Sequence, residues 1–179
     1  MSDPQLHTTQ PGLSYPIGAT VYPDGVNFSV YARRAAGIDL LLFDGLDAVR
    51  PARVISLDAQ INRTYDYWHV FVPGIGPGQV YAYRAHGPHE PLRGLWRPEA
   101  GLRFDSQKVL LDPYGRGVAM PRKSNRDAAI NPGDNVAPAM KSVVIDPRVY
   151  DWEGDRPLRL PYAETIIYEM HVRGFTRHP

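Results

Sequence analysis

The chain has 179 residues, and its 20 lysines and arginines against 19 aspartates and glutamates give a formal net charge of +1. A chain of this length can bury one substantial core, and its near-neutral charge argues against nucleic acid as a main partner, because phosphate binding requires a basic excess on one face. Cysteine is absent, which excludes disulfides and thiolate chemistry. The 18 prolines and 16 glycines make up about a fifth of the chain, against about an eighth in average proteins. This excess favours short strands joined by turns over long helices.

The sequence shows no export or membrane signal. Residues 1–11 lack a basic start followed by an apolar run, so they do not resemble a secretory signal. The apolar runs are far shorter than the ~20 residues that a membrane-spanning helix requires. We therefore expect a cytoplasmic protein without a membrane partner.

Short runs of alternating or β-branched residues predict strands. In chain order they are residues 26–31, 38–43, 53–57, 65–72, 79–84, 108–111 and 142–145. The run at 65–72 is the strongest, because it is dense in aromatic and β-branched residues, and we expect it to form a hairpin with the run at 79–84. Short strands separated by turn signals predict an antiparallel β-sandwich.

Two stretches are typical of connectors. Residues 119–139 are polar, carry several prolines and show no periodicity, and residues 146–163 are similar. After them, residues 164–172 form a nearly continuous apolar run, which is typical of a strand buried on both faces of a parallel sheet. The chain reaches Pro179 soon afterwards, so we expect this strand to belong to a longer protein.

Patterns typical of a catalytic nucleophile or a metal site are missing from the sequence, whereas spacing alone does not exclude a pair of carboxylates of the glycosidase type and places none together. No serine lies in a Gly-x-Ser-x-Gly elbow, and no histidine forms a helical pair with a glutamate that would bind zinc. The acidic residues Asp151, Glu153 and Asp155 lack the glycine and glutamate spacing of a calcium loop. We therefore expect no catalytic residue, no cofactor and no metal site in this chain.

Aromatic residues are the more informative feature. Along residues 65–72 both faces of the predicted strand are apolar or aromatic. One face can fill the sandwich core, and the other must meet another domain or offer a stacking platform for sugars, whose C–H faces rest on flat rings. Trp96, in the loop-like stretch 93–98, and Trp68 are therefore candidate carbohydrate-binding residues. Core packing is the alternative for Trp68.

Ordered sequence blocks give the chain a resemblance to a known family. They include residues 15–20 (YPIGAT), 24–30 (DGVNFSV), 67–74 (YWHVFVPG), 108–114 (KVLLDPY), 151–156 (DWEGDR) and 167–176 (IYEMHVRGFT). In this order they resemble the N-terminal region of isoamylase-type glycogen debranching enzymes, which are glycoside hydrolases of the α-amylase superfamily. The resemblance spans nearly the whole chain after the first dozen residues.

The resemblance implies a domain organisation. Residues 13–146 are expected to form an immunoglobulin-like antiparallel β-sandwich of the carbohydrate-binding-module type, with an irregular segment at 119–139, after a disordered or extended stretch at 1–12. Residues 147–163 are expected to form a linker, and residues 164–179 the start of a catalytic (β/α)₈ barrel, beginning with its first strand.

The resemblance also implies a function. The parent enzyme is expected to hydrolyse α-1,6 branch linkages in glycogen with two carboxylates of the barrel, none of which can be placed in this chain. The chain itself is therefore expected to be inactive, to position α-glucan and to pack on the barrel. Two alternatives stay open: a docking module without sugar affinity, and the front end of a related branching or trehalose-releasing α-glucan enzyme.

Overall fold

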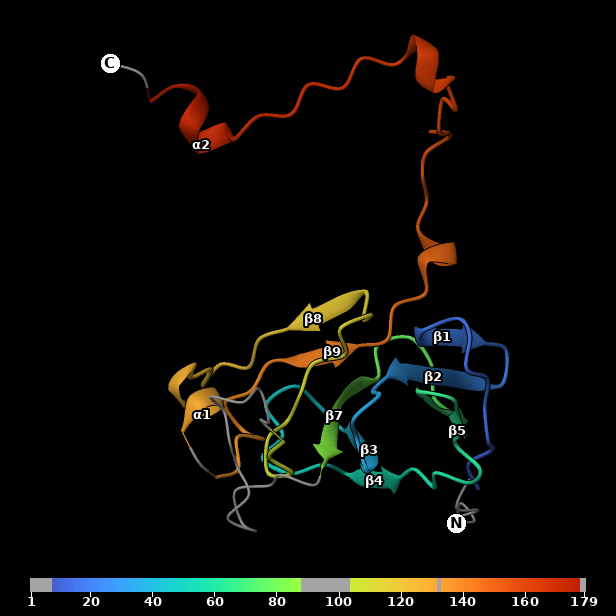
Figure 1. Cartoon of the computed structure of the whole chain (residues 1–179), viewed down its shortest axis with the longest axis vertical. Helices are drawn as coiled ribbons and strands as arrows, with labels where there is room; N and C mark the ends of the chain where they lie inside the picture. Colours follow the sequence, from blue (N-terminus) through green and yellow to red (C-terminus); the bar gives the residue numbers. More distant parts are fainter. Residues whose placement is uncertain (1–7, 88–103, 132, 178–179) are drawn as a thin grey trace. The chain divides into compact units, whose positions relative to one another are not determined.

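The computed structural model describes residues 8–87, 104–131 and 133–177, and the chain divides into two compact units, Met1–Pro147 and Arg148–Pro179. The described part of the first unit is built from two antiparallel sheets (Figure 1). One sheet has the strand order β1-β2-β6-β5, and the other has the order β4-β3-β7-β9-β8. The strands are β1 (Gly18–Tyr22), β2 (Gly25–Tyr31), β3 (Gly37–Phe43), β4 (Arg53–Ser56), β5 (Arg63–Thr64), β6 (Tyr67–Pro73), β7 (Val80–His86), β8 (Gly117–Ala119) and β9 (Lys141–Val143).

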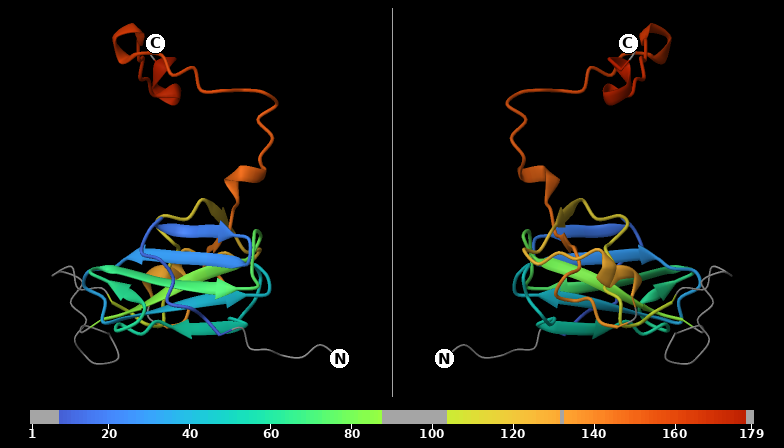
Figure 2. Two further views of the ribbon diagram at one scale, coloured as in Figure 1. Left: turned by 90° about the vertical axis from the view of Figure 1, so that its right-hand side faces the viewer. Right: turned by 90° about the vertical axis from the view of Figure 1, so that its left-hand side faces the viewer.

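Alternation along the long strands places one face of each in a common core between the sheets. The main core includes Val26, Phe28 and Val30 of β2, Leu40 and Leu42 of β3, Trp68, Val70 and Val72 of β6, and Tyr81 and Tyr83 of β7. Burial of each large apolar side chain contributes roughly 1.5–3 kcal/mol. The predicted all-β antiparallel sandwich is therefore confirmed, and Figure 2 shows its strands from two opposite sides.

The predicted hairpin between residues 65–72 and 79–84 is wrong, because the two strands belong to different sheets. β6 pairs with β2 and β5, whereas β7 pairs with β3 and β9. The loop between them contains Gly74 and Gly78 at positive φ, 76° and 88°, and carries the chain from one sheet to the other. Connections that change sheets are usual in β-sandwiches.

Three strands were not predicted from the sequence, and one predicted strand is not formed. The sequence patterns did not predict β1, β5 or β8, and β1 pairs along its whole length with β2. The predicted strand at 108–111 is reduced to a single bridge between Leu110 and Tyr83. It goes no further because the next backbone N–H, that of Asp112, donates to the Ser142 hydroxyl at 3.0 Å, and proline at 113 has no N–H to offer.

A second, smaller core covers the outer face of the five-stranded sheet. Leu41, Phe43 and Ala82 of the sheet pack there against Val109 and Val136. The last two come from residues 104–131 and 133–139, which are irregular apart from β8, the bridge at Leu110 and the single turn α1 (Asp127–Ile130). This face of the sheet is thus closed by the chain itself.

The helices of the described chain are short. Besides α1 they are η3 (Pro147–Val149), η4 (Tyr162–Glu164) and α2 (Val172–Phe175). Within the parts of the chain that the structure describes, no helix has the length and apolar character needed to cross a membrane.

The second unit does not contain the strand expected over residues 164–172. Its described residues, up to position 177, are exposed, and the expected strand is replaced by extended chain between η4 and α2. A strand needs a neighbour to accept its backbone hydrogen bonds, and no described residue supplies one here. The assignment of 147–163 to a linker and of 164–179 to the start of a barrel stays a prediction.

Candidate functional site

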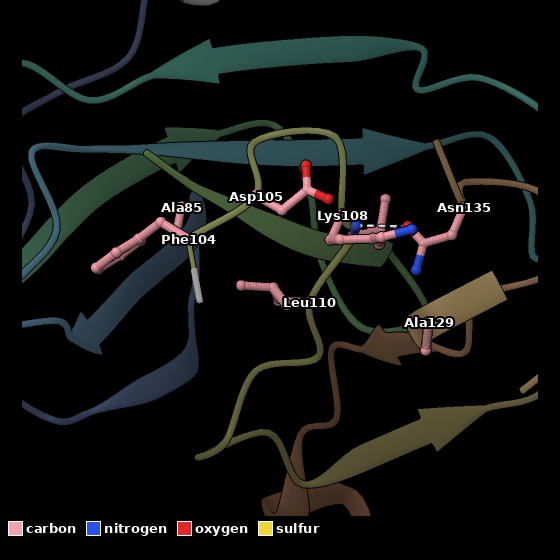
Figure 3. A pocket seen from close by; sticks show the side chains of 8 residues that line it. Ala85, Phe104, Asp105, Lys108, Leu110, Ala129 and Asn135 are labelled. Carbon is pink, nitrogen blue, oxygen red and sulfur yellow. Dashed lines mark hydrogen bonds between the residues drawn. The ribbon is translucent and has the colours of Figure 1, made fainter. Parts of the chain in front are cut away.

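A pocket of about 400 Å³ lies beside β7, within the size range of small-molecule sites. It is lined by Ala85, Phe104, Asp105, Lys108, Val109, Leu110, Ala129 and Asn135. Figure 3 shows the Phe104 ring at one end of this pocket and Asn135 at the other, with Lys108 and Leu110 between them. We refer to it as the Phe104 pocket.

Backbone hydrogen bonds fix one wall of the Phe104 pocket to the sheet. The Leu110 N–H donates to the Tyr83 carbonyl at 2.8 Å, and the Tyr83 N–H donates to the Leu110 carbonyl at 2.9 Å. Upstream, the Asp105 carboxylate accepts from the Gln107 N–H at 3.0 Å and its carbonyl accepts from the Lys108 N–H at 3.0 Å, which closes a turn. The pocket wall is therefore held in place before any ligand arrives.

The opposite wall depends on Lys108. Its ammonium donates to the backbone carbonyls of Ala128 at 2.8 Å and Gly133 at 2.6 Å, and also to that of Asn131. An ammonium has only three protons to donate, so all of them are used. Lys108 therefore positions the turn around α1 and offers no unpaired cation to a ligand.

Asn135 joins the two walls. Its side-chain oxygen accepts from the Val109 N–H at 2.7 Å, and the residue is almost completely buried. The pocket thus combines an aromatic ring, aliphatic side chains and an amide with Lys108, whose ammonium is hydrogen-bonded to carbonyl oxygens, and Asp105, whose carboxylate accepts from a backbone N–H. Such a lining suits a neutral, amphipathic ligand such as a sugar, whose C–H faces contact rings and whose hydroxyls bond to amides.

Several ionisable groups of the described residues have an altered pKa, and those in the core include Asp112, Tyr81 and Tyr83. Burial raises the pKa of Asp112, whose carboxylate accepts from the Tyr81 hydroxyl at 2.8 Å and from the Tyr114 N–H at 2.8 Å. Burial also raises the pKa of Tyr81 and of Tyr83. Within the described residues, no cluster of three His, Asp or Glu side chains is placed to hold a metal ion. None of these three shifted groups lines the Phe104 pocket.

Trp68 lies inside the sandwich, with 1% of its surface exposed. Its indole N–H donates to the Ala32 carbonyl at 3.3 Å, and the Arg63 guanidinium lies 5.0 Å from the ring centroid. The buried ring leaves no face for a sugar. Trp68 therefore packs in the core, which was the alternative to glucan binding.

Trp96 lies outside the described residues. The residues that do form the Phe104 pocket were not singled out as binding residues by the sequence patterns. The signal that points to them is their position: Ala85 and Phe104 lie on either side of the segment that contains Trp96.

The second face of β6, predicted to meet another domain or to stack on sugars, is partly covered by the chain itself. His69 is 5% exposed, because residues 10–14 lie over it. Its Nδ1 lies 2.8 Å from the Pro11 carbonyl, which can only accept, so Nδ1 carries the proton. Phe71 and Tyr67 stay partly exposed on either side of His69.

Comparisons with known proteins point to one family. The profile of carbohydrate-binding module 48 (isoamylase N-terminal domain) matches residues 16–115. The chain is 40% identical to a glycogen debranching enzyme of Serratia proteamaculans, an alignment that covers 94% of this chain and 24% of the relative. It is 41% identical to chloroplastic isoamylase 1 of Arabidopsis thaliana, over 93% of this chain and 20% of that protein.

A solved structure shares the fold. Apo pullulanase from Paenibacillus barengoltzii superposes with a TM-score of 0.54 at 21% identity, covering 94% of this chain and 21% of that one. The chain thus spans between a fifth and a quarter of the length of the curated relatives described above.

Proposed function

The chain belongs to the carbohydrate-binding module 48 family, the isoamylase N-terminal domain, and from this premise we propose that it binds α-glucan as the non-catalytic N-terminal module of a glycogen debranching enzyme. The observation that carries the proposal is the Phe104 pocket, which is preformed and lined by an aromatic ring, aliphatic side chains and an amide, while its two charged side chains, Asp105 and Lys108, are hydrogen-bonded to backbone groups. These are the features that a neutral glucan requires.

Trp96 would extend this site. It lies in the segment that joins Ala85 to Phe104, two residues that line the pocket. A tryptophan in such a connection offers a flat ring for the apolar face of a glucose unit. We propose Trp96 as a second stacking residue for the same ligand.

The activity of the whole protein is the second part of the proposal. Relatives named glycogen debranching enzyme and isoamylase support hydrolysis of α-1,6 branch linkages by the parent enzyme, with a carboxylate nucleophile and a carboxylic acid on its catalytic barrel. The chain described here would hold the glucan for that barrel, and by itself it would show no hydrolysis of glycogen.

Packing on the barrel is supported by the second unit. Ile166, Ile167 and Tyr168 are 96%, 78% and 75% exposed, and apolar side chains exposed in series are typical of a surface that another part of a protein covers. We propose that residues 164–179 lie within the barrel of the parent enzyme. A docking role for the module is compatible with glucan binding; docking without sugar affinity is the alternative that the following experiment separates.

Affinity electrophoresis in gels that contain glycogen tests the binding proposal. The chain is expected to migrate more slowly in the presence of glycogen, and Phe104→Ala and Trp96→Ala are each expected to restore part of its mobility. Tyr65→Asn is the matched control, because it removes a 90% exposed ring at a φ of 55° that asparagine tolerates. Equal mobility with and without glycogen would favour the docking module.

The parent activity has its own test. The full-length protein is expected to release linear chains from glycogen. Transfer of branches or release of trehalose instead would assign the module to a related α-glucan enzyme.

A further inference from the structure

Residues 10–14 form a strap across the outer face of the four-stranded sheet. Gln10 exchanges two backbone hydrogen bonds with Phe71, at 2.9 and 3.0 Å. The side chain of Asn27 accepts from the Leu13 N–H at 2.7 Å and donates to the Leu13 carbonyl at 2.9 Å. The Ser29 hydroxyl donates to the Ser14 carbonyl at 2.7 Å. Buried polar side chains of the sheet thus hold the strap through its backbone.

Gly12 allows the strap to lie this close to the sheet. Its φ is 77°, and a Cβ at this position would lie 2.6 Å from the Val70 carbonyl carbon and 2.8 Å from the Asn27 side-chain oxygen. A left-handed backbone in direct contact with another backbone favours glycine. The strap is therefore a built part of the first unit.

A second pocket of about 400 Å³ lies between the strap and the strands β1, β2 and β6. Its lining includes Gln10, Pro11, Leu13, Tyr22, Asp24 and Phe71. The rings of Tyr22 and Phe71 meet edge to face, with centroids 6.2 Å apart. We refer to this site as the strap pocket.

We infer that the strap pocket is a second α-glucan-binding site, on the sheet other than the one that carries the Phe104 pocket. The ligand class rests on the proposed function. The partly exposed Tyr22 and Phe71 rings can contact the C–H face of a glucose unit. The exposed Asp24 carboxylate and Gln10 amide can bond to its hydroxyls.

The charge of the lining separates a sugar from an anionic ligand. Among the described residues that line the strap pocket, Asp24 is the charged one, and none of them is a lysine or arginine. A phosphate or carboxylate would meet repulsion here without a cation to balance it, whereas a neutral hexose would not.

The same sheet provides an internal comparison. Tyr31 and Tyr67 also meet edge to face, with centroids 5.4 Å apart, but neither ring lines the strap pocket. If exposed rings alone were enough, this pair would bind glucan as well. We therefore expect glucan to bind at Tyr22 and Phe71, which line the strap pocket, and not at Tyr31 and Tyr67.

Two sites on one module would change how it holds glycogen. A branched glucan that occupies one pocket presents its neighbouring chains to the other at high effective concentration. The module would then prefer branched glucan over a short linear chain by more than either site alone explains.

NMR titration of the chain with maltoheptaose tests the inference. Signals of Tyr22, Phe71 and the strap are followed separately from those of Phe104 and Asn135. We expect both groups to shift. Phe71→Ala and Tyr22→Ala should each weaken binding at the strap pocket about tenfold. In both variants the Phe104 signals should shift with maltoheptaose as they do in the unsubstituted chain. Tyr31→Ala is the matched control and should alter neither site.

The outcomes distinguish the inference from the proposed function. Shifts at Phe104 alone would overturn the second site and leave glucan binding intact. Shifts at the strap pocket alone would support the second site and remove the Phe104 pocket from the proposal. No shift at either site would overturn both. Because Tyr22→Ala and Phe71→Ala probe one site from different strands, misfolding of one variant leaves the other as the test.

Discussion

At the scale of single residues, the buried Lys141 and the half-buried Lys108 hold irregular chain against the sheet. Lys141 in β9 is fully buried, and its ammonium donates to the carbonyls of Val136 at 2.8 Å, Leu46 at 3.1 Å and Ala139 at 3.3 Å. The ammonium also lies 5.1 Å from the centroid of the Phe43 ring. Burial lowers the pKa of Lys141, and the carbonyl oxygens offset part of the cost of burying its charge. Lys108 uses the same arrangement at the Phe104 pocket.

The variant Lys141→Met is expected to lower the free energy of unfolding by about 3 kcal/mol, because it leaves buried carbonyl groups without a donor. Urea denaturation followed by tyrosine and tryptophan fluorescence measures the change. Lys123→Met removes an exposed lysine and should alter stability by less than about 0.5 kcal/mol. Equal midpoints for the two variants would show that Lys141 does not hold the loops.

Asp112 should give the fold a pH dependence. Burial raises the pKa of its carboxyl above the ordinary value of 3.8, so the folded state binds this proton more tightly than the unfolded state. The free energy of unfolding therefore falls as the pH rises from below 3.8 through the raised value. The variant Asp112→Asn removes this titratable carboxyl group and therefore its contribution to the pH dependence.

The measurement is urea denaturation of both proteins between pH 3 and 7. We expect the stability of the unsubstituted chain, relative to that of Asp112→Asn, to decrease as the pH rises above 3.8. The exposed residue Asp44 provides the control variant Asp44→Asn. A difference that stays constant across this range would contradict the burial of an ionising Asp112.

At the scale of elements, the strap covers polar side chains on the outer face of the four-stranded sheet, whereas the inner face of that sheet is apolar. Asn27, Ser29 and His69 are buried on the outer face of the four-stranded sheet because strap carbonyls and one strap N–H satisfy them. Buried polar groups of this kind stabilise a structure only when they are paired. The strap and these residues should therefore open together.

The variant Asn27→Ala tests this coupling. Loss of both bonds to Leu13 should speed hydrogen exchange of the Gln10 and Leu13 amides about tenfold or more, while the core amides of β3 exchange as before. Gln60→Ala, at an exposed position, should change nothing. Unaltered exchange at Gln10 would show that the strap is held independently of Asn27.

The second unit should behave differently from the sandwich. The amides of residues 166–171 lie in exposed, extended chain without strand partners among the described residues. We expect them to exchange within the dead time of a mass-spectrometric measurement on the monomeric chain. In the full-length enzyme they should become protected if they enter a barrel sheet. Slow exchange throughout 166–171 in the monomer would contradict this account.

Sequence patterns predicted the elements that depend on local alternation. The runs that became β2, β3 and β6 alternate or are β-branched, and their inward faces form the core. The assignment of β6 and β7 to different sheets could not be predicted. A glycine-rich loop between two strands is compatible with a hairpin and with a crossover between sheets.

The candidate sites were less accessible to prediction for a related reason. The Phe104 pocket and the strap pocket each form where residues distant in sequence meet, such as Asn135 with Val109 and Leu13 with Asn27. Trp68 is a residue type that stacks on sugars, but it lies on the face of β6 that is buried in the core. The aromatic residues and the family resemblance led to the ligand class that we propose, and tertiary contacts decide which residues are available to it.

At the scale of the whole molecule, the near-zero net charge and the ring-lined pockets support the same partner. A net charge of +1 neither attracts nor repels a neutral polysaccharide. The Phe104 pocket contains one acidic and one basic side chain, both hydrogen-bonded to backbone groups, and the charged residue among the described lining of the strap pocket is Asp24. The family, the fold and the pocket chemistry therefore support one account, in which the module holds α-glucan and the catalytic work belongs to another part of the parent enzyme.

Calorimetric titration of the chain with maltoheptaose tests this account most directly, with a β-1,4-linked oligosaccharide of similar length as the control ligand. The account predicts a saturable heat of binding for maltoheptaose, which Phe104→Ala reduces, and none for the control. The absence of heat with maltoheptaose at millimolar concentration, or equal heat with both ligands, would contradict it.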